Sequence, residues 1–405
     1  MSTVVEMPRD GARGARAGRL RIAVIVNMVA PYTRPLFEAL AARDDCDLLV
    51  VSETPMEGGR RWQPESELPF EHVLLDSWTL NLAPLAVGSG FKTRFDTYLY
   101  VPKHPLRALV DFAPDAVVAG GGGIWSSPAN IAALLARPRH GWALVPWWGS
   151  FTRRRPTLPR RLADPWVKTF MRAADAWLVY GTRHARDVVE LGADADRVVV
   201  TPITPLAPDP PLRRDGRRDG ETRYLFVGRL IERKGLDVLL QAFERCAGGE
   251  LWIVGDGPLQ EVAAAAATRD RRIRALGHLA GGDLASAYLE ADALVVPSLY
   301  EPWGLVVHEG LAYGLSVITT DQVGAADDLV EPGVNGYVAS AGSAEALAEA
   351  MNAFAAWTPD QREQAAEESA RKLAAFSIER AVEGFVDGCS LAVEHRRPHA
   401  SGARR

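Results

Sequence analysis

Short continuous apolar runs recur along the whole chain and constrain its fold more than any other feature. In the first half they are RIAVIV (21–26), DLLVVS (47–52), DAVVAG (115–120), ALVPWW (143–148) and AWLVYG (176–181). Segments with helix-like patterns separate these runs. Runs that are apolar at consecutive positions predict strands buried on both faces, which is typical of parallel sheets covered by helices on each side. The sequence therefore predicts an α/β fold with doubly wound sheets.

The same alternation stops once and then restarts. The stretch PITPLAPDPPLRRDGRRDGE (202–221) is rich in proline, glycine and charge, which is typical of a linker. The second half continues with RYLFVG (223–228), ELWIVG (250–255), IRALG (273–277), ALVVPS (293–298) and SVITT (316–320). We expect solvated tails at 1–18 and 397–405, a domain at 19–203, a linker at 204–221, a domain at 222–376, and a helix at 377–396 that packs back on the first domain.

Composition narrows the class of protein. The 405 residues suffice for two or three domains, and 47% of them are hydrophobic. A net charge of -5 argues against general nucleic-acid binding. The three cysteines are far apart and show no disulfide or zinc pattern, and the first eighteen residues lack the apolar core of a signal peptide. No apolar run is long enough to span a membrane. These features predict a cytoplasmic protein.

Polar or glycine-rich signals follow four strands of the second half. Arg229 and Lys234 follow the first strand, Gly255 ends the second, His278 and Leu279 follow the third, and EPWGLVVHEG (301–310) follows the fourth. Ligands of doubly wound sheets bind beyond the carboxyl ends of the strands, so these signals converge on one edge. The Gly255–Gly257 pair lacks the third glycine of a dinucleotide-binding loop, because Gln260 stands in its place.

The chemistry of these residue types fits a sugar nucleotide. A helix expected to start near Trp303–Gly304 presents free backbone N–H groups to a phosphate. Arg229 and Lys234 add the positive charge that a diphosphate needs. Carboxylates repel phosphate but accept hydrogen bonds from sugar hydroxyls, so Glu301 and Glu309 are suited to the sugars at the two ends of a nucleoside diphosphate sugar.

The motifs GRLIERKG, IVGDGP and EPWGLVVHEGLAYGLSVITT resemble the nucleotide-binding half of glycosyltransferase family 4, a group of retaining enzymes with the two-domain GT-B fold. The resemblance implies that Glu309 binds the ribose, Glu301 binds the transferred sugar, Arg229 and Lys234 bind the diphosphate, and the His278–Leu279 loop contacts the base. The expected catalytic residues are Arg229, Lys234 and Glu301. The expected donor-binding residues are Arg229, Lys234, Gly255, His278, Leu279, Glu301, Trp303, Gly304, Leu305 and Glu309.

The first half is expected to bind the acceptor. NMVAPYTR (27–34) leaves the first strand, a run of four glycines follows the third, and PWWGSF (146–151) ends the fourth. Relatives often carry an important histidine near this last position, where this chain has Gly149 and Ser150. The acceptor-side candidates are therefore Asn27, Tyr32, Arg34, Gly121 and Ser150.

Two further segments have alternative readings. The basic segment 151–172 is interleaved with aromatic and aliphatic residues, so it fits either a solvated helix face or contact with an anionic membrane surface. Asp194-Ala195-Asp196 spells a metal-binding DxD motif, but it precedes a strand instead of ending one, and we expect no metal and no cofactor.

The sequence as a whole predicts a metal-independent retaining hexosyltransferase that uses a UDP-sugar or GDP-sugar and a hydroxyl acceptor, such as a polysaccharide, a lipid-linked sugar or a secondary metabolite. The alternatives are a sugar-nucleotide epimerase of the same fold and a catalytically degenerate GT-B scaffold at a membrane.

Overall fold

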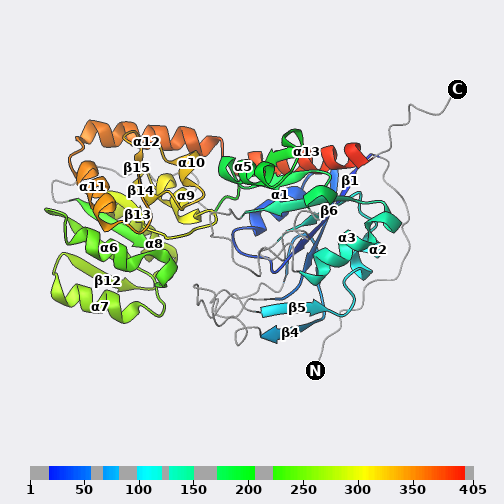
Figure 1. Cartoon of the computed structure of the whole chain (residues 1–405), viewed down its shortest axis with the longest axis horizontal. Helices are drawn as coiled ribbons and strands as arrows, with labels where there is room; N and C mark the ends of the chain where they lie inside the picture. The colour runs from blue at the N-terminus through cyan, green and yellow to red at the C-terminus, as the bar shows by residue number, and fades with distance from the viewer. Residues whose placement is uncertain are drawn as a thin grey trace.

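The computed structural model has two α/β domains side by side (Figure 1). It describes residues 18–55, 67–81, 98–120, 127–149, 171–205 and 222–396. The predicted tails lie almost wholly outside these ranges, as do most of the predicted linker 204–221 and most of the basic segment 151–172.

The N-terminal domain is built on a parallel sheet that has seven strands within the described residues. Its order is β3 (Glu71–Leu74), β2 (Cys46–Ser52), β1 (Leu20–Val26), β6 (Ala116–Ala119), β7 (Ala143–Trp148), β8 (Trp177–Val179) and β9 (Val198–Val200). The five strands predicted from the apolar runs are confirmed. Residues Ile22–Val26 and Ala116–Ala119 are buried, as expected for strands covered on both faces.

Within the described residues of this domain, four helices separate the strands: α1 (Arg34–Ala41), α2 (Arg107–Phe112), α3 (Pro128–His140) and α5 (Thr182–Glu190). The predictions did not include β3, nor the antiparallel hairpin of β4 (Ser77–Asn81) and β5 (Tyr98–Pro102). The hairpin lies apart from the main sheet (Figure 1). Its exposed Trp78 and Leu80 do not belong to a continuous apolar run, which explains why it was missed.

The C-terminal domain contains a second parallel sheet, with six strands in the described residues. Its order is β12 (Ile273–Gly277), β11 (Glu250–Val254), β10 (Arg223–Val227), β13 (Ala293–Val296), β14 (Ser316–Thr320) and β15 (Gly336–Ala339). The accompanying helices are α6 (Leu236–Phe243), α7 (Gln260–Arg269), α8 (Gly281–Glu290), α9 (Leu305–Ala312), α10 (Ala326–Leu329), α11 (Ala344–Ala355) and α12 (Pro359–Ala374). The five predicted strands are again present, and the fold prediction is confirmed.

The strand order of each sheet reverses once, and this reversal sets where a ligand can bind. In the C-terminal sheet the chain moves from β10 through β11 to β12 and then returns to place β13 on the other side of β10. In the N-terminal sheet β6 takes the corresponding place beside β1. The connections after neighbouring strands at such a point run in opposite directions and leave a crevice beyond the carboxyl ends.

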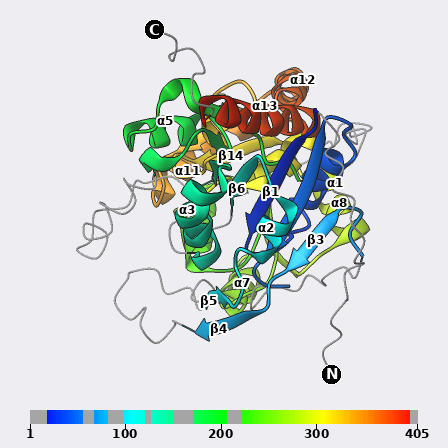
Figure 2. The ribbon, with the colours of Figure 1, turned by 90° about the vertical axis from the view of Figure 1, so that its right-hand side faces the viewer.

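The last helix returns to the N-terminal domain. Helix α13 (Ile378–Arg396) lies across that domain in Figure 2, and its buried residues belong to the core that contains β1, β6 and β7. Gly388 permits the close approach, because a Cβ atom there would lie 2.3 Å from Leu178 Cδ2. Arg396 Nε donates to the Gly141 carbonyl at 2.7 Å. The C-terminal domain is thus joined to its neighbour by two chain crossings.

Candidate active site

The reversal point of the C-terminal sheet brings Lys234 and Glu301 into contact. Lys234 lies in the 3-10 turn Glu232–Lys234 that follows β10, and Glu301 lies in the loop that follows β13. The Lys234 Nζ atom is 2.5 Å from Glu301 Oε2, and the two side chains are only 17% and 13% exposed. The predicted phosphate-binding lysine and the predicted sugar-binding carboxylate therefore form an ion pair.

Helix α9 starts beside this ion pair. Its N-cap is Gly304, whose φ of 101° lies in the left-handed region, where a side chain is strained. A Cβ atom on Gly304 would also lie 2.9 Å from Val323 Cγ1. Leu305 is the first helical residue, directly after the predicted start near Trp303–Gly304, and the first N–H groups of a helix have no partner within it. The turn thus presents donor groups near Lys234.

Glu309 lies within α9 and accepts a hydrogen bond from Tyr288 of α8. The Tyr288 hydroxyl is 2.7 Å from Glu309 Oε2, and its ring stacks on Tyr313 with a centroid separation of 4.8 Å. Burial raises the pKa of the Glu309 carboxyl, while the Tyr288 hydroxyl and the Lys234 charge act in the opposite direction. The hydroxyl therefore stabilises the charged, hydrogen-bond-accepting form of Glu309.

Arg229 and Gly255 occupy neighbouring strand ends. Arg229 is half-buried after β10, and the Leu230 N–H donates to the Asp256 carbonyl at 2.7 Å. Gly255 has a φ of 143°, and a Cβ atom there would lie 1.8 Å from the Gly228 carbonyl oxygen. Glycine at this position allows two backbone segments to touch, so its structural role is to bring the loop that carries Arg229 close to the loop after β11.

The remaining predicted donor residues lie in different surroundings. His278 is exposed and Leu279 half-buried after β12. The Trp303 side chain is buried, and its ring centroid lies 5.9 Å from that of His184 in the N-terminal domain, so it belongs to the domain junction. His308, which was not among the predicted site residues, lies within α9 and is buried, and this burial lowers its pKa to about 4. A neutral, buried imidazole is a packing residue here.

The predicted acceptor-side residues are only partly described. The Asn27 carbonyl accepts N–H donors from Glu53 and Thr54, both at the end of β2. Tyr32 is half-buried and packs against the core of the C-terminal domain, and Arg34 Nε is 2.5 Å from Glu38 Oε1 within α1. Gly121 and Ser150 lie outside the described residues.

Glu53 is a buried carboxylate at the carboxyl edge of the N-terminal sheet. It was not among the residues predicted from the sequence. Its side chain is 4% exposed and accepts a hydrogen bond from Ser127 Oγ at 2.6 Å. Burial raises its pKa, while Ser127 and the Ala129 backbone lower it. The only signal in the sequence was a polar SET triplet directly after an apolar run, which is common in loops. Glu53 holds the start of α3 beside Asn27.

Comparison with known proteins identifies the family of the chain. A family model described as "Glycosyl transferase 4-like domain" matches residues 29–204, and one described as "Glycosyl transferases group 1" matches residues 221–356. The chain is 34% identical over 364 residues to a glycogen synthase of Mycobacterium tuberculosis, covering 81% of this chain and 82% of that protein. The chain belongs to the group 1 glycosyltransferases.

Other relatives of this glycosyltransferase align over less of their length or share only its fold. It is 34% identical over 131 residues to a glycosyltransferase of Methanocaldococcus jannaschii, and the match covers 31% of this chain and 33% of that protein. The crystal structure of HepE from Anabaena in complex with UDP superimposes with a TM-score of 0.66 at 16% identity, covering 92% of this chain and all of that one. The GT-B fold is therefore shown, and the family favours transfer over the epimerase and scaffold alternatives.

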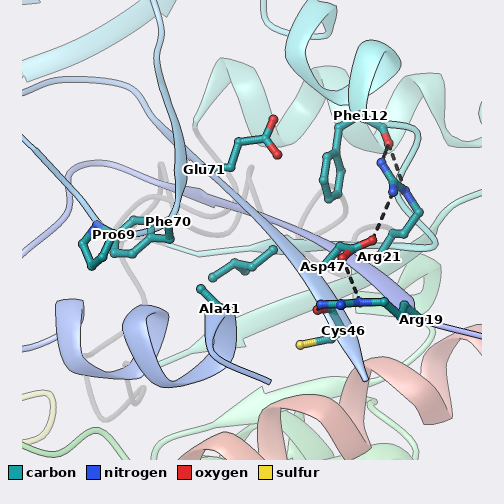
Figure 3. Close-up of a pocket in the computed structure, with 10 residues that line it drawn as sticks. Arg19, Arg21, Ala41, Cys46, Asp47, Pro69, Phe70, Glu71 and Phe112 are labelled. Carbon is teal, nitrogen blue, oxygen red and sulfur yellow. Dashed lines mark hydrogen bonds and ion pairs between the residues drawn. The ribbon is translucent and has the colours of Figure 1, made fainter. Parts of the chain in front are cut away.

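A cavity also lies at the opposite edge of the N-terminal sheet, away from the candidate active site. Figure 3 shows a cavity of about 390 Å³ at the amino ends of β1 and β2, the edge opposite to Asn27. Its two arginines are already paired: Arg19 Nε lies 2.9 Å from Asp47, and Arg21 donates to Asp47 and to the Phe112 carbonyl. Glu71 also lines the cavity, so the two arginines face two carboxylates there, and such a site does not suit a phosphate.

Two findings concern the described residues alone. Within the ranges given above, no helix combines the length and hydrophobicity needed to cross a membrane. No group of three or more His, Cys, Asp or Glu side chains in those ranges is arranged to hold a metal ion. The Asp194 carboxylate of the DxD motif accepts the Asp196 N–H at 3.2 Å and caps the 3-10 turn Ala195–Arg197.

Proposed function

We propose that this glycosyltransferase transfers a hexose from a nucleoside diphosphate sugar to a hydroxyl acceptor, with retention of configuration and without a metal ion. The observation that carries the proposal is the placement of Lys234, Glu301 and Glu309 around the start of α9, at the reversal point of the C-terminal sheet. HepE, which shares the fold, was crystallised with UDP, with UDP and glucose, and with UDP-glucose.

Each residue has a distinct role in the proposed reaction. Arg229, Lys234 and the first N–H groups of α9 stabilise the charge that develops on the departing diphosphate. Glu309 accepts hydrogen bonds from the ribose, and Glu301 holds the transferred sugar. Positive side chains take the place that a divalent cation has in metal-dependent transferases.

The family resemblance supports a same-face reaction. The bond between the anomeric carbon and the phosphate oxygen breaks, and its electron pair stays on the diphosphate. The acceptor oxygen forms the new bond on the same face of the sugar, and its proton moves to the departing phosphate oxygen. Configuration at the anomeric carbon is thereby retained without a covalent enzyme intermediate.

A donor screen followed by product analysis tests the proposal. UDP, GDP and their common hexose conjugates are tested by thermal shift in EDTA, and stabilising donors are then incubated with hydroxyl acceptors and analysed by mass spectrometry and NMR. We expect a glycoside with the anomeric configuration of the donor. An inverted product, binding that is lost on chelation, or an epimerised nucleotide sugar formed without acceptor would each refute the corresponding part of the proposal.

A further inference from the structure

The start of helix α5, in the N-terminal domain, is docked on the C-terminal domain. The Thr182 backbone N–H donates to Asp328 Oδ2 at 3.0 Å, and the Thr182 hydroxyl bonds to the same carboxylate. Arg183 forms an ion pair with Asp327 and donates to the Asp321 carbonyl at 2.7 Å. An aspartate of one domain thus caps a helix of the other, a task that a residue of the helix itself usually performs.

The third residue of α5 contacts the loop that carries Glu301. The His184 Nε2 atom is 2.9 Å from the carbonyl oxygen of Pro302, the residue directly after Glu301. A carbonyl only accepts hydrogen bonds, so the imidazole must donate from Nε2. The ring is fully buried between Tyr180 and Trp303, each with its centroid 5.9 Å away. This packing leaves the imidazole little freedom to turn away from Pro302.

Hydrogen bonds join the Glu301 loop to the segment after β14 that contacts Thr182 and Arg183. The Glu301 N–H donates to the Gln322 carbonyl at 2.9 Å, and the Gly324 N–H donates to the Glu301 carbonyl at 3.0 Å. A Cβ atom on Gly324 would lie 2.1 Å from the Pro302 carbonyl oxygen. A Cβ atom on Gly181 would lie 2.3 Å from the Asp328 carboxylate. The backbone at each of these two glycines therefore lies directly against its neighbour, with no room for a side chain.

We propose that His184 is a positioning residue that holds Glu301 in place from the opposite domain. Together with Thr182 and Arg183 it forms the α5 clasp, defined as these three residues and their contacts to Pro302, Asp327 and Asp328. Glu301 is then held on one side by Lys234 and on the other by the clasp. The inference rests on the proposed role of Glu301 in holding the transferred sugar.

Substitution of His184 tests the proposal. Turnover is measured as nucleoside diphosphate released from the nucleotide sugar, and affinity is measured by calorimetry with UDP or GDP alone. We expect His184→Ala to lower kcat at least tenfold and to leave nucleotide Kd within about twofold, because Lys234 and Glu309 lie within the C-terminal domain. His184→Gln retains an N–H donor and should restore most of kcat. Equal losses in His184→Ala and His184→Gln would overturn the proposal.

A double-mutant cycle separates this inference from the proposed function. If His184 acts through Glu301, the variant His184→Ala/Glu301→Gln should be no slower than Glu301→Gln alone. Independent losses that multiply would overturn the clasp and leave the proposed role of Glu301 intact. Unchanged turnover in Glu301→Gln would instead refute the proposed function, and the inference with it.

A milder variant keeps the proposal testable if His184→Ala does not fold. Asp327→Asn removes the charge that pairs with Arg183, and we expect kcat to fall by about threefold or more while nucleotide Kd stays the same. Asp270→Asn is the matched control, because Asp270 forms a similar ion pair with Arg272 before the amino end of β12. A loss of kcat of the same size in the control, or none in Asp327→Asn, would count against the clasp.

Discussion

Replacing Glu301 by glutamine should tighten the binding of a bare nucleoside diphosphate while slowing sugar transfer. Glutamine keeps the size of the side chain and removes its charge. The Lys234 ammonium is paired with Glu301 at 2.5 Å, so a diphosphate must compete with this carboxylate. The substitution frees Lys234 for the phosphate and removes a nearby negative charge that repels it.

The size of the effect follows from this contact. A hydrogen bond between charged groups contributes about 1.5–3 kcal/mol. This is the upper limit of the energy that is lost when a diphosphate displaces Glu301 from Lys234. Lysine has three N–H donors and can keep Glu301 while it contacts a phosphate, so only part of that energy is regained. We expect about 0.7–1.4 kcal/mol, which is a threefold to tenfold lower Kd.

Calorimetry with UDP and GDP in EDTA measures the affinity, and release of nucleoside diphosphate from the donor measures turnover. Turnover should fall at least tenfold, because the sugar is no longer held as charge develops at its anomeric carbon. Glu232→Gln is the control, since Glu232 is exposed in the same turn as Lys234. If Glu301→Gln binds the nucleoside diphosphate more weakly than the wild type, by as much as Glu309→Gln does, the assignment of the two glutamates is wrong.

The remaining predictions concern the nucleotide site and the buried Glu53. Arg229→Ala and Lys234→Ala should each weaken nucleoside diphosphate binding in EDTA at least tenfold, since each removes a charge-assisted contact of about 1.5–3 kcal/mol; calorimetry that finds neither change would argue against the diphosphate site. Glu309→Gln should weaken the same binding, and wild-type affinity should fall as the pH decreases through the raised pKa of Glu309, because the protonated form loses its acceptor character. Tyr288→Phe should move this decrease to higher pH, and an unchanged profile would contradict the role of its hydroxyl. Burial raises the pKa of Glu53, so the stability that it contributes is present at acidic pH and is lost as the pH rises through that value. Glu53→Gln removes this ionisation, so the free energy of unfolding of the variant, relative to that of the wild type, should be larger at neutral pH than at acidic pH. Denaturant unfolding at the two pH values measures this difference, and the opposite trend would refute the reasoning.

The sequence by itself determined the strands and the chemical types at their ends. Continuous apolar runs such as RIAVIV and ELWIVG report burial on both faces, and this property is local to each strand. The positions of Arg229, Lys234, Glu301 and Glu309 relative to these strands are equally local. Because parallel strands share one carboxyl edge, local information sufficed to predict that Lys234 and Glu301 lie close together.

Only the tertiary structure decided which side chains meet. The ion pair between Lys234 and Glu301 exists because β13 returns to lie beside β10, and no pattern within either segment encodes that order. Nothing in the sequence around Tyr288 indicated that α8 places its hydroxyl against Glu309. The clasp between His184 and Pro302 joins residues from two domains. Such contacts join residues that are far apart in the sequence. They form only when the sheets and domains pack together, and local sequence patterns do not specify that packing.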